Sequence, residues 1–158
     1  MNTQAIKAAL RTFPYGVYLL GTEHAGETRV ATVTWVTQAS FSPPLVVMGV
    51  KKTGRTFGLL KHSRKFSLSV LETGQKEIAF AFFKTAEVVG GAASGFAFET
   101  ARAGVPLLSR ALAWLEGRVL HIDETGDHAV VIGQVTAAAQ KREGLPLTLA
   151  ELGLKYGG

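Results

Sequence analysis

The sequence predicts a mainly β, barrel-like fold with a few short helices. Its apolar runs are short, turn residues separate these runs at short intervals, and strands do not alternate regularly with helices. Many short strands with few helices are typical of barrels and other β-dominated folds. A parallel dinucleotide-binding fold is disfavoured, because the GxGxxG and GxxxxGK[ST] motifs are both absent.

The first half of the chain alternates between strand and helix patterns. In order, we expect a helix at 3–12, strands at 16–22, 28–36 and 44–50, a helix at 53–61, a strand at 66–71 and a helix at 74–84. Pro14 ends the first helix, and the hydroxyl of Thr53 caps the second. The run PLVVMGV at 44–50 is almost continuously apolar, which predicts burial of both faces. Residues 66–71 alternate strictly and predict a half-buried strand.

The second half begins with a Gly- and Ala-rich stretch at 85–104, which predicts a long, partly irregular loop. Loops of this length are usually functional or mobile, so Thr85 to Arg102 is interpreted as a lid. Three strands are then expected near 111–122, 128–139 and the C-terminal region, with a turn at Gly126-Asp127. The chain has no repeats and no linker, which predicts one domain over residues 1–158.

Composition excludes several classes of function. The chain has 158 residues, 47% of them hydrophobic, which predicts a folded core. The net charge of +5 is scattered rather than gathered in a polybasic segment, so a phosphate-bearing small molecule is favoured over nucleic acid. Without cysteine there are no disulfides, no thiolate catalysis and no cysteine metal sites.

The sequence also indicates a location and the absence of a metal centre. No apolar run approaches the ~18 residues of a membrane span, and the first residues lack the apolar region of a secretory signal. We therefore expect a cytoplasmic protein that does not bind membranes. His24, His62 and His121 are not spaced as metal ligands, so no metal site is expected.

The most informative stretch runs from Thr28 to Leu60. A strand of small and hydroxyl-bearing residues leads to the break at Ser42-Pro43-Pro44, and a cationic turn, KKTGRT, follows the next strand. This combination suits a flat polar heterocycle with a phosphate tail, because cations and the N–H groups of a helix N-terminus bind phosphate. By itself, the KKTGRT turn also fits a solvated turn with a capping threonine.

An ordered set of short motifs runs through most of the chain. It comprises Pro14-Tyr15-Gly16-Val17, Ala31 to Trp35, Ser40-Phe41-Ser42-Pro43-Pro44-Leu45, Phe66 to Leu71, Gly104 to Leu108, Ala113 to Glu116, Gly126-Asp127-His128 and Ile132-Gly133-Gln134-Val135. With these motifs in this order, the chain resembles the flavin reductase-like family. The resemblance implies an FMN-binding split β-barrel of Greek-key type with about six strands. It also implies a homodimer that holds FMN, or alternatively FAD, near the dimer interface.

The resemblance further implies the residues of a flavin site. The expected cofactor-binding residues are Ala31, Thr32, Val33, Thr34, Trp35, Gln38, Ala39, Ser40, Val50, Lys51, Thr53, Arg55, Thr56, Phe83 and Lys84. Tyr15, His128 and Tyr156 are expected to contact the substrate, and His128 is the expected catalytic residue. A histidine suits this position because it changes charge near neutral pH.

Structural alternatives accompany these assignments. His128 also fits a residue that merely opens a strand after a Gly-Asp turn, and Phe82 is expected in the core. Tyr156 belongs either to a disordered tail or to a stack over a cofactor in the partner subunit. Glu77, Glu87 and Glu116 are interpreted as surface or interface charges.

The implied activity is hydride transfer from NADH or NADPH to the bound flavin, with reduced flavin passing to a flavin-dependent monooxygenase or another acceptor. Trp35 departs from the family pattern, in which this position is commonly small. Together with the apolar stretch at 85–103, it favours an alternative: an FMN-binding protein without efficient NAD(P)H turnover that binds small aromatic ligands over the flavin. A third alternative is a basic β-barrel module that contacts nucleic acid.

Overall fold

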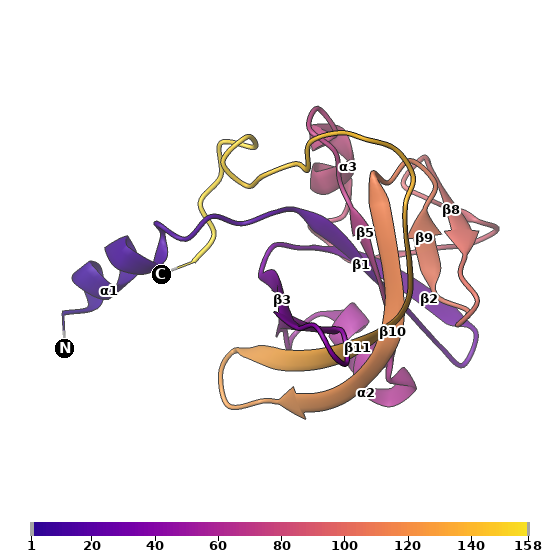
Figure 1. Cartoon of the computed structure of the whole chain (residues 1–158), viewed down its shortest axis with the longest axis horizontal. Helices are drawn as coiled ribbons and strands as arrows, with labels where there is room; N and C mark the ends of the chain where they lie inside the picture. Colours follow the sequence, from indigo (N-terminus) through magenta and orange to yellow (C-terminus); the bar gives the residue numbers. More distant parts are fainter. Residues whose placement is uncertain (1, 158) are drawn as a thin grey trace.

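One strongly curved eight-stranded sheet forms the body of the computed structural model, which describes residues 2–157 (Figure 1). Its strands, in spatial order, are β3 (Val36–Ser40), β4 (Leu45–Lys51), β11 (His128–Gln140), β10 (Ala113–Asp123), β5 (Lys65–Val70), β1 (Tyr18–His24), β2 (Glu27–Val33) and β6 (Ala86–Glu87). Every neighbouring pair is antiparallel. The expected mainly β fold is therefore confirmed.

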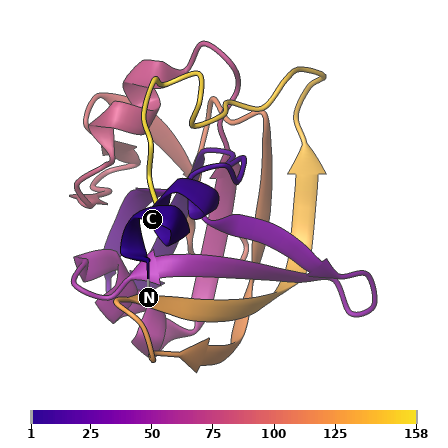
Figure 2. The same cartoon turned by 90° about the vertical axis from the view of Figure 1, so that its left-hand side faces the viewer.

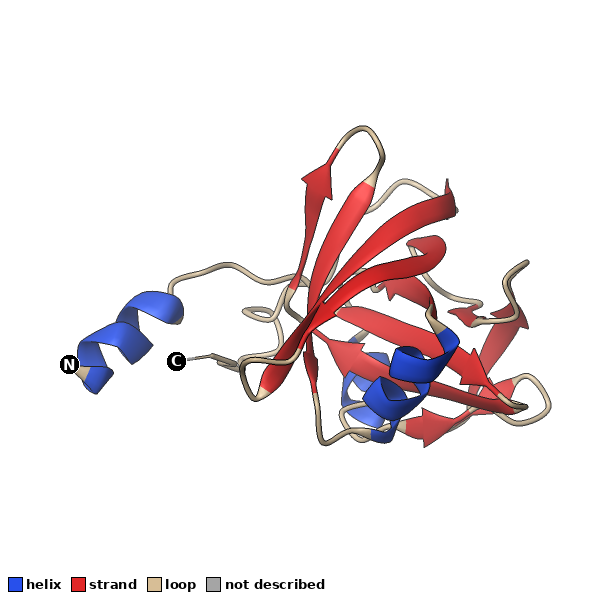
Figure 3. Cartoon of the chain, turned by 90° about the horizontal axis from the view of Figure 1, so that it is seen from below, coloured by secondary structure: helices blue, strands red, loops and turns tan. Residues whose placement is uncertain are grey.

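Three helices and a small second sheet complete the described part of the chain, residues 2–157. The helices are α1 (Thr3–Leu10), α2 (Arg55–Ser63) and α3 (Lys76–Ala81), and the second sheet consists of β7 (Ala92–Ala93), β8 (Phe96–Thr100) and β9 (Pro106–Leu108). Seen from below, α1 stands apart from the strands (Figure 3). Helix α2 instead buries Phe57, Leu59 and Leu60 against the barrel, which fixes its N-terminus beside the ends of β2 and β4.

The core consists of two apolar clusters. Inside the barrel, Leu20, Met48, Phe66 and Val131 belong to one cluster. The other lies under α3 and the second sheet, where the buried ring of Phe82 packs against Phe96 and Phe98. The expectation that Phe82 is a core residue is confirmed, since its side chain is fully buried.

The prediction of a long, partly irregular loop over 85–104 is wrong, because β6, β7 and β8 lie within this segment. Ala93 and Phe98 from this segment are buried in the core. Glycines with positive φ, at Gly91 and Gly95, allow the tight turns on either side of β7. The segment is thus packed onto the barrel rather than arranged as an irregular lid.

Burial of two strands differs from the prediction because distant segments cover or expose their faces. Strand β5 is buried on both faces, since Ser67 donates a hydrogen bond to the Pro106 carbonyl and Ser69 Oγ accepts one from Leu108 N at 3.0 Å. Strand β4 buries only alternate residues, and Val47 stays half-buried on its outer face. A strand with one partly solvated face is usual in antiparallel sheets.

Local predictions at the helix ends and near the C-terminus also need correction. Gly54, not Thr53, precedes α2 and gives no side-chain cap, whereas Asn2 Oδ1 caps α1 by accepting a hydrogen bond from Ala5 N at 3.1 Å. The C-terminal region forms isolated bridges, such as that between Gly16 and Thr148, instead of a strand. Proline at 146 cannot donate a ladder hydrogen bond, which limits pairing there.

Glu116 is not a surface charge. Glu116 is 3% exposed, and its carboxylate accepts a hydrogen bond from Ala103 N at 3.0 Å. This hydrogen bond joins the segment before β9 to β10. It also gives the buried carboxylate the polar partner that a buried charged group requires.

Helix α1 forms an arm that leaves the barrel, and the C-terminal segment returns beside it (Figures 1 and 2). None of its residues is buried, and Ile6, Leu10 and Phe13 on or beside it are exposed. Within residues 2–157, no helix is long and apolar enough to cross a membrane.

Candidate functional site

An open cavity of about 500 Å³ lies where the ends of β2 and β4 meet the N-terminus of α2. Residues 153–157, which we call the strap, close one side of it. The predicted residues that line the cavity are Ala31, Thr32, Val33, Thr34, Trp35, Val50, Lys51, Thr56, Phe83, His128 and Tyr156. The fold thus gathers residues from the cationic turn, the hydroxyl-bearing strand and the Asp-His turn around one space.

Strand β2 and the residues after it provide a wall of small and hydroxyl-bearing side chains. Thr32 is engaged by the protein, because its hydroxyl donates to the Ala79 carbonyl at 2.8 Å. Thr34 is only 7% exposed, and its hydroxyl makes no hydrogen bond to any residue in 2–157. A hydroxyl without a protein partner, on a residue that lines a cavity, is suited to a polar ligand.

The second wall follows the cationic turn at 51–55, of whose three charged residues only Lys51 lines the cavity. Arg55 forms an ion pair with Glu27, and Lys52 Nζ donates to the Glu124 carbonyl at 2.8 Å. Hydrogen bonds from Arg55 and then Arg29 lower the pKa of Glu27 to about 2, so this carboxylate stays charged and compensates Arg55. Lys51 lines the cavity and has no carboxylate partner among the described residues.

The N-terminus of α2 lies beside Lys51. Gly54 and Thr56 line the cavity, and the Thr56 hydroxyl lies 2.6 Å from the Thr85 hydroxyl. The first N–H groups of a helix lack partners within the helix and attract anions. Lys51, this helix end and the two hydroxyls together make the part of the cavity best suited to a phosphate.

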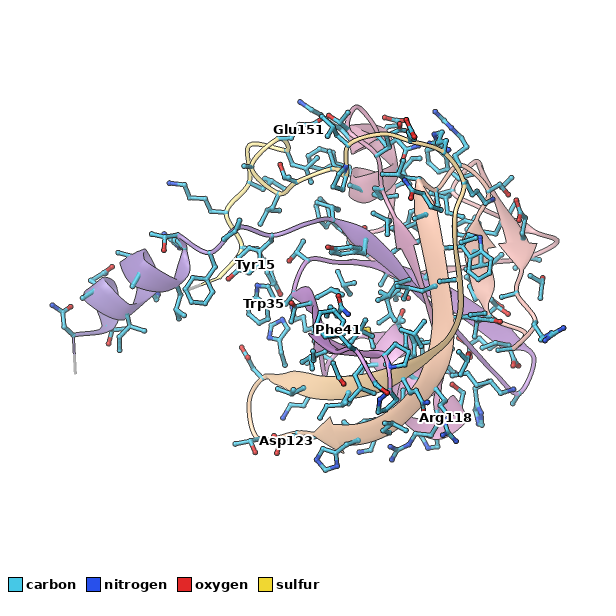
Figure 4. The ribbon with its side chains drawn as sticks, in the orientation of Figure 1. Tyr15, Trp35, Phe41, Arg118, Asp123 and Glu151 are labelled. Atoms are coloured by element: carbon cyan, nitrogen blue, oxygen red, sulfur yellow. The ribbon has the colours of Figure 1, made fainter. Side chains whose placement is uncertain are left out.

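The third wall is aromatic. The ring of Trp35 lies 4.6 Å from that of His128 and 5.2 Å from that of Tyr156, as measured between ring centroids. Figure 4 shows Trp35 close to Tyr15, the ring centroids being 6.4 Å apart. The indole Nε1 of Trp35 is buried and has no hydrogen-bond partner in the described chain. This unpaired donor is available to an acceptor atom on a bound ring.

Hydrogen bonds on both ring nitrogens hold His128. Its Nδ1 lies 2.9 Å from Asp127 Oδ1, and its Nε2 lies 2.7 Å from the Tyr156 hydroxyl. Because a carboxylate only accepts, Nδ1 carries the proton and Nε2 accepts from Tyr156. The hydrogen bond from His128 lowers the pKa of Asp127, whereas burial and then the Asp127 charge raise that of Tyr156. Tyr156 therefore stays a donor at neutral pH.

Several predicted residues lie outside the cavity lining. They are Gln38, Ala39 and Ser40 on the edge strand β3, Thr53 and Arg55 in the turn, Lys84 after α3, and Tyr15, which lines a neighbouring cavity. The alternation of β3 is interrupted by a bulge between Gln38 and Ser40, and the Gln38 amide donates to the Ser40 carbonyl instead.

Some lining residues were not predicted from the sequence. They are Leu20, Gly49, Gly54, Phe57, Thr85, Leu149, Leu154 and Lys155. Leu154 and Lys155 of the strap belong to no motif that indicates a site, and only the folded chain brings them to the cavity. Among the described residues, no group of three His, Asp or Glu side chains is placed to hold a metal ion.

Comparison with known proteins places this site in a family. The flavin reductase like domain matches residues 10–157. The NADH-dependent flavin reductase StyB of Pseudomonas fluorescens is 31% identical over 159 residues, covering 100% of this chain and 91% of that protein. The Streptomyces globisporus NADH:FAD oxidoreductase SgcE6, solved in complex with NAD and FAD fragments, is 31% identical with a TM-score of 0.72, over 84% of this chain and 79% of that one.

A third relative binds a different ligand. The FMN-binding protein of Thermus thermophilus, solved with p-hydroxybenzaldehyde bound, is 25% identical with a TM-score of 0.69, over 82% of this chain and 73% of that one. Some curated relatives are longer: this chain spans 58% of the Stachydrine N-demethylase reductase subunit Stc3 of Rhizobium meliloti, to which it is 28% identical. It spans 43% and 25% of two others. The match over nearly all of its length shows that this chain belongs to the flavin reductase-like domain family.

Proposed function

We propose that this protein binds FMN, or alternatively FAD, and reduces it with NADH. The observation that carries the proposal is the division of one cavity into a hydroxyl-bearing wall, an anion-binding corner and an aromatic face. A bound flavin supplies the hydride acceptor, and the protein supplies orientation and polarity. The named activities of StyB and SgcE6 support NADH as the donor.

Each wall has a distinct task in this proposal. Lys51, Thr56 and the N-terminus of α2 bind the flavin phosphate. Backbone groups of 31–35 and the free Thr34 hydroxyl bind the polar edge of the ring, while Trp35 packs beside it. His128 faces the reacting side, where Asp127 fixes its tautomer and leaves Nε2 as an acceptor for the donor's carboxamide group.

A second candidate function is binding of small aromatic ligands over the flavin without efficient turnover of NADH. It is favoured by Trp35, whose indole narrows the cavity next to His128 and Tyr156. The Thermus relative with bound p-hydroxybenzaldehyde supports the same alternative.

Anaerobic stopped-flow mixing of the FMN-loaded protein with NADH distinguishes the two functions. We expect NADH to bleach the visible absorbance of the bound flavin, because reduction by hydride transfer removes the colour of the oxidised cofactor. NADPH is tested in parallel. Loss of absorbance with dithionite but not with either nucleotide would contradict the reductase function. Tight binding of p-hydroxybenzaldehyde under the same conditions would then favour the second candidate.

We also propose that the active protein is a homodimer. An eight-residue helix that buries nothing on its own chain is marginal in water, because isolated helices of this length gain too little. Ile6, Leu10 and Phe13 at the arm, together with Val130 on the outer face of β11, supply apolar surface for a second copy. Sedimentation should give twice the chain mass of 16.8 kDa. The Leu10→Glu variant should shift it toward the monomer, whereas a monomeric unsubstituted protein would contradict the dimer.

The proposed acceptor of the reduced flavin is a flavin-dependent monooxygenase. A relative named as the reductase component of 4-hydroxyphenylacetate 3-monooxygenase supports this class of partner. The proposed compartment is the cytoplasm, where NADH is available to such a pair of enzymes.

A further inference from the structure

The strap separates two cavities that otherwise adjoin. Leu154, Lys155 and Tyr156 line both the flavin cavity of about 500 Å³ and a second cavity of about 440 Å³. Arg11, Phe13 and Tyr15 form the far side of the second cavity. Movement of the strap would therefore join the two spaces into one trough that runs from Trp35 to Arg11.

Few contacts hold the strap in place. Its first residue donates a backbone hydrogen bond, from Gly153 N to the Ala150 carbonyl at 3.0 Å. Beyond it, the described hydrogen bonds are side-chain contacts: Tyr156 to His128 at 2.7 Å and Arg11 Nε to the Gly157 carbonyl at 3.1 Å. Leu154 and Tyr156 remain exposed. A segment with so few buried contacts and backbone hydrogen bonds opens at low cost.

The contacts of the strap match those that a pyridine nucleotide offers. Tyr156 brings an aromatic ring to within 5.2 Å of the Trp35 ring, at a tilt of 50°, and donates a hydrogen bond to His128 Nε2. A nicotinamide likewise combines a flat ring with a carboxamide N–H donor. Gly157 presents an oxygen to Arg11, as a phosphate does. No carboxylate in residues 2–157 forms an ion pair with Arg11, so its charge is available to an anion.

We propose that the strap occupies the pyridine nucleotide site: Tyr156 takes the place of the nicotinamide ring, and Arg11 is the receptor for the nucleotide's phosphates. NADH enters by displacing residues 153–157, so the strap and the nucleotide compete for Trp35, His128 and Arg11. This inference rests on the proposed reductase function. It adds a second subsite, reaching from the flavin cavity to α1, and a reason for the strap to be loosely held.

The experiment measures NADH binding to the FMN-loaded protein from the concentration dependence of flavin bleaching, with NAD⁺ titrations as a second readout. Tyr156→Ala should lower the Kd for NADH about tenfold, because the competing ring contact and hydrogen bond are lost. Tyr156→Phe keeps the ring but loses the hydroxyl. Its Kd for NADH should therefore lie between the values of the unsubstituted protein and of Tyr156→Ala. Arg11→Gln should raise the Kd about tenfold, although it also loosens the strap. Leu145→Ala, an exposed site outside both cavities, is the matched control and should leave the Kd unchanged.

The opposite signs of Tyr156→Ala and Arg11→Gln are the diagnostic result, because a purely structural strap would move both in the same direction. The Kd for FMN should stay the same in Arg11→Gln and Leu145→Ala, since neither residue lines the cavity assigned to the flavin. A Tyr156→Ala protein that binds NADH no more tightly, or an Arg11→Gln protein that binds it more tightly, would overturn the proposal. These failures differ from failure of the reductase function, which would show as an absence of bleaching in the unsubstituted protein.

Discussion

Replacing Gly117 with alanine is expected to reduce the free energy of unfolding by about 3 kcal/mol or more. A Cβ atom at this position would lie 2.1 Å from the Gln134 carbonyl oxygen and 2.7 Å from the ring of Phe66. The first contact is to the backbone of the paired strand β11, next to a register irregularity in β10. The second is to a fully buried ring in the barrel core. Neither neighbour can move without disturbing the sheet or the core packing.

Gly58→Ala is the matched control for this prediction. Gly58 lies inside α2, and a Cβ added there meets nothing within 4 Å. Alanine should therefore stabilise the protein by about 0.5–1 kcal/mol through its better helix propensity. Urea denaturation followed by circular dichroism measures both changes. A Gly117→Ala protein within 1 kcal/mol of the unsubstituted one would contradict the packing described for Phe66.

Short-range patterns account for the parts of the fold that were predicted from the sequence. The strand expected at 44–50 and the helix expected at 53–61 each follow from neighbouring residues, and the structure has them as β4 (Leu45–Lys51) and α2 (Arg55–Ser63). The alternation of apolar and polar residues within one strand is local information. It predicts the buried side chains correctly when only one face of that strand packs against the core.

Long-range contacts explain what the sequence did not show. Ser67 and Ser69 are predicted to face solvent, yet β9, about forty residues later, accepts and donates the hydrogen bonds that bury them. Arg55 appears from the sequence as a phosphate ligand, and only the fold reveals that Glu27 compensates its charge. The strap is a similar case for Leu154 and Lys155, which were not predicted, because their position at the cavity depends on the path of the whole chain.

The same distinction among the cations leads to the second large effect. Lys51→Gln is expected to raise the Kd for FMN about tenfold, corresponding to about 1.4 kcal/mol. Lys51 lines the cavity next to the N-terminus of α2 and has no carboxylate partner in the described chain. Its charge is therefore free to act on a phosphate, although solvent exposure limits the gain.

Lys52→Gln is the matched control, because this adjacent lysine donates to the Glu124 carbonyl and does not line the cavity. It should leave the Kd for FMN within about twofold of the unsubstituted value, a difference below 0.5 kcal/mol. Fluorescence quenching of FMN, and of riboflavin in parallel, separates the phosphate contact from general damage to the site. Riboflavin lacks the phosphate, so Lys51→Gln should bind it as well as the unsubstituted protein does. Equal weakening of FMN and riboflavin would show that Lys51 supports the ring pocket and would place the phosphate elsewhere.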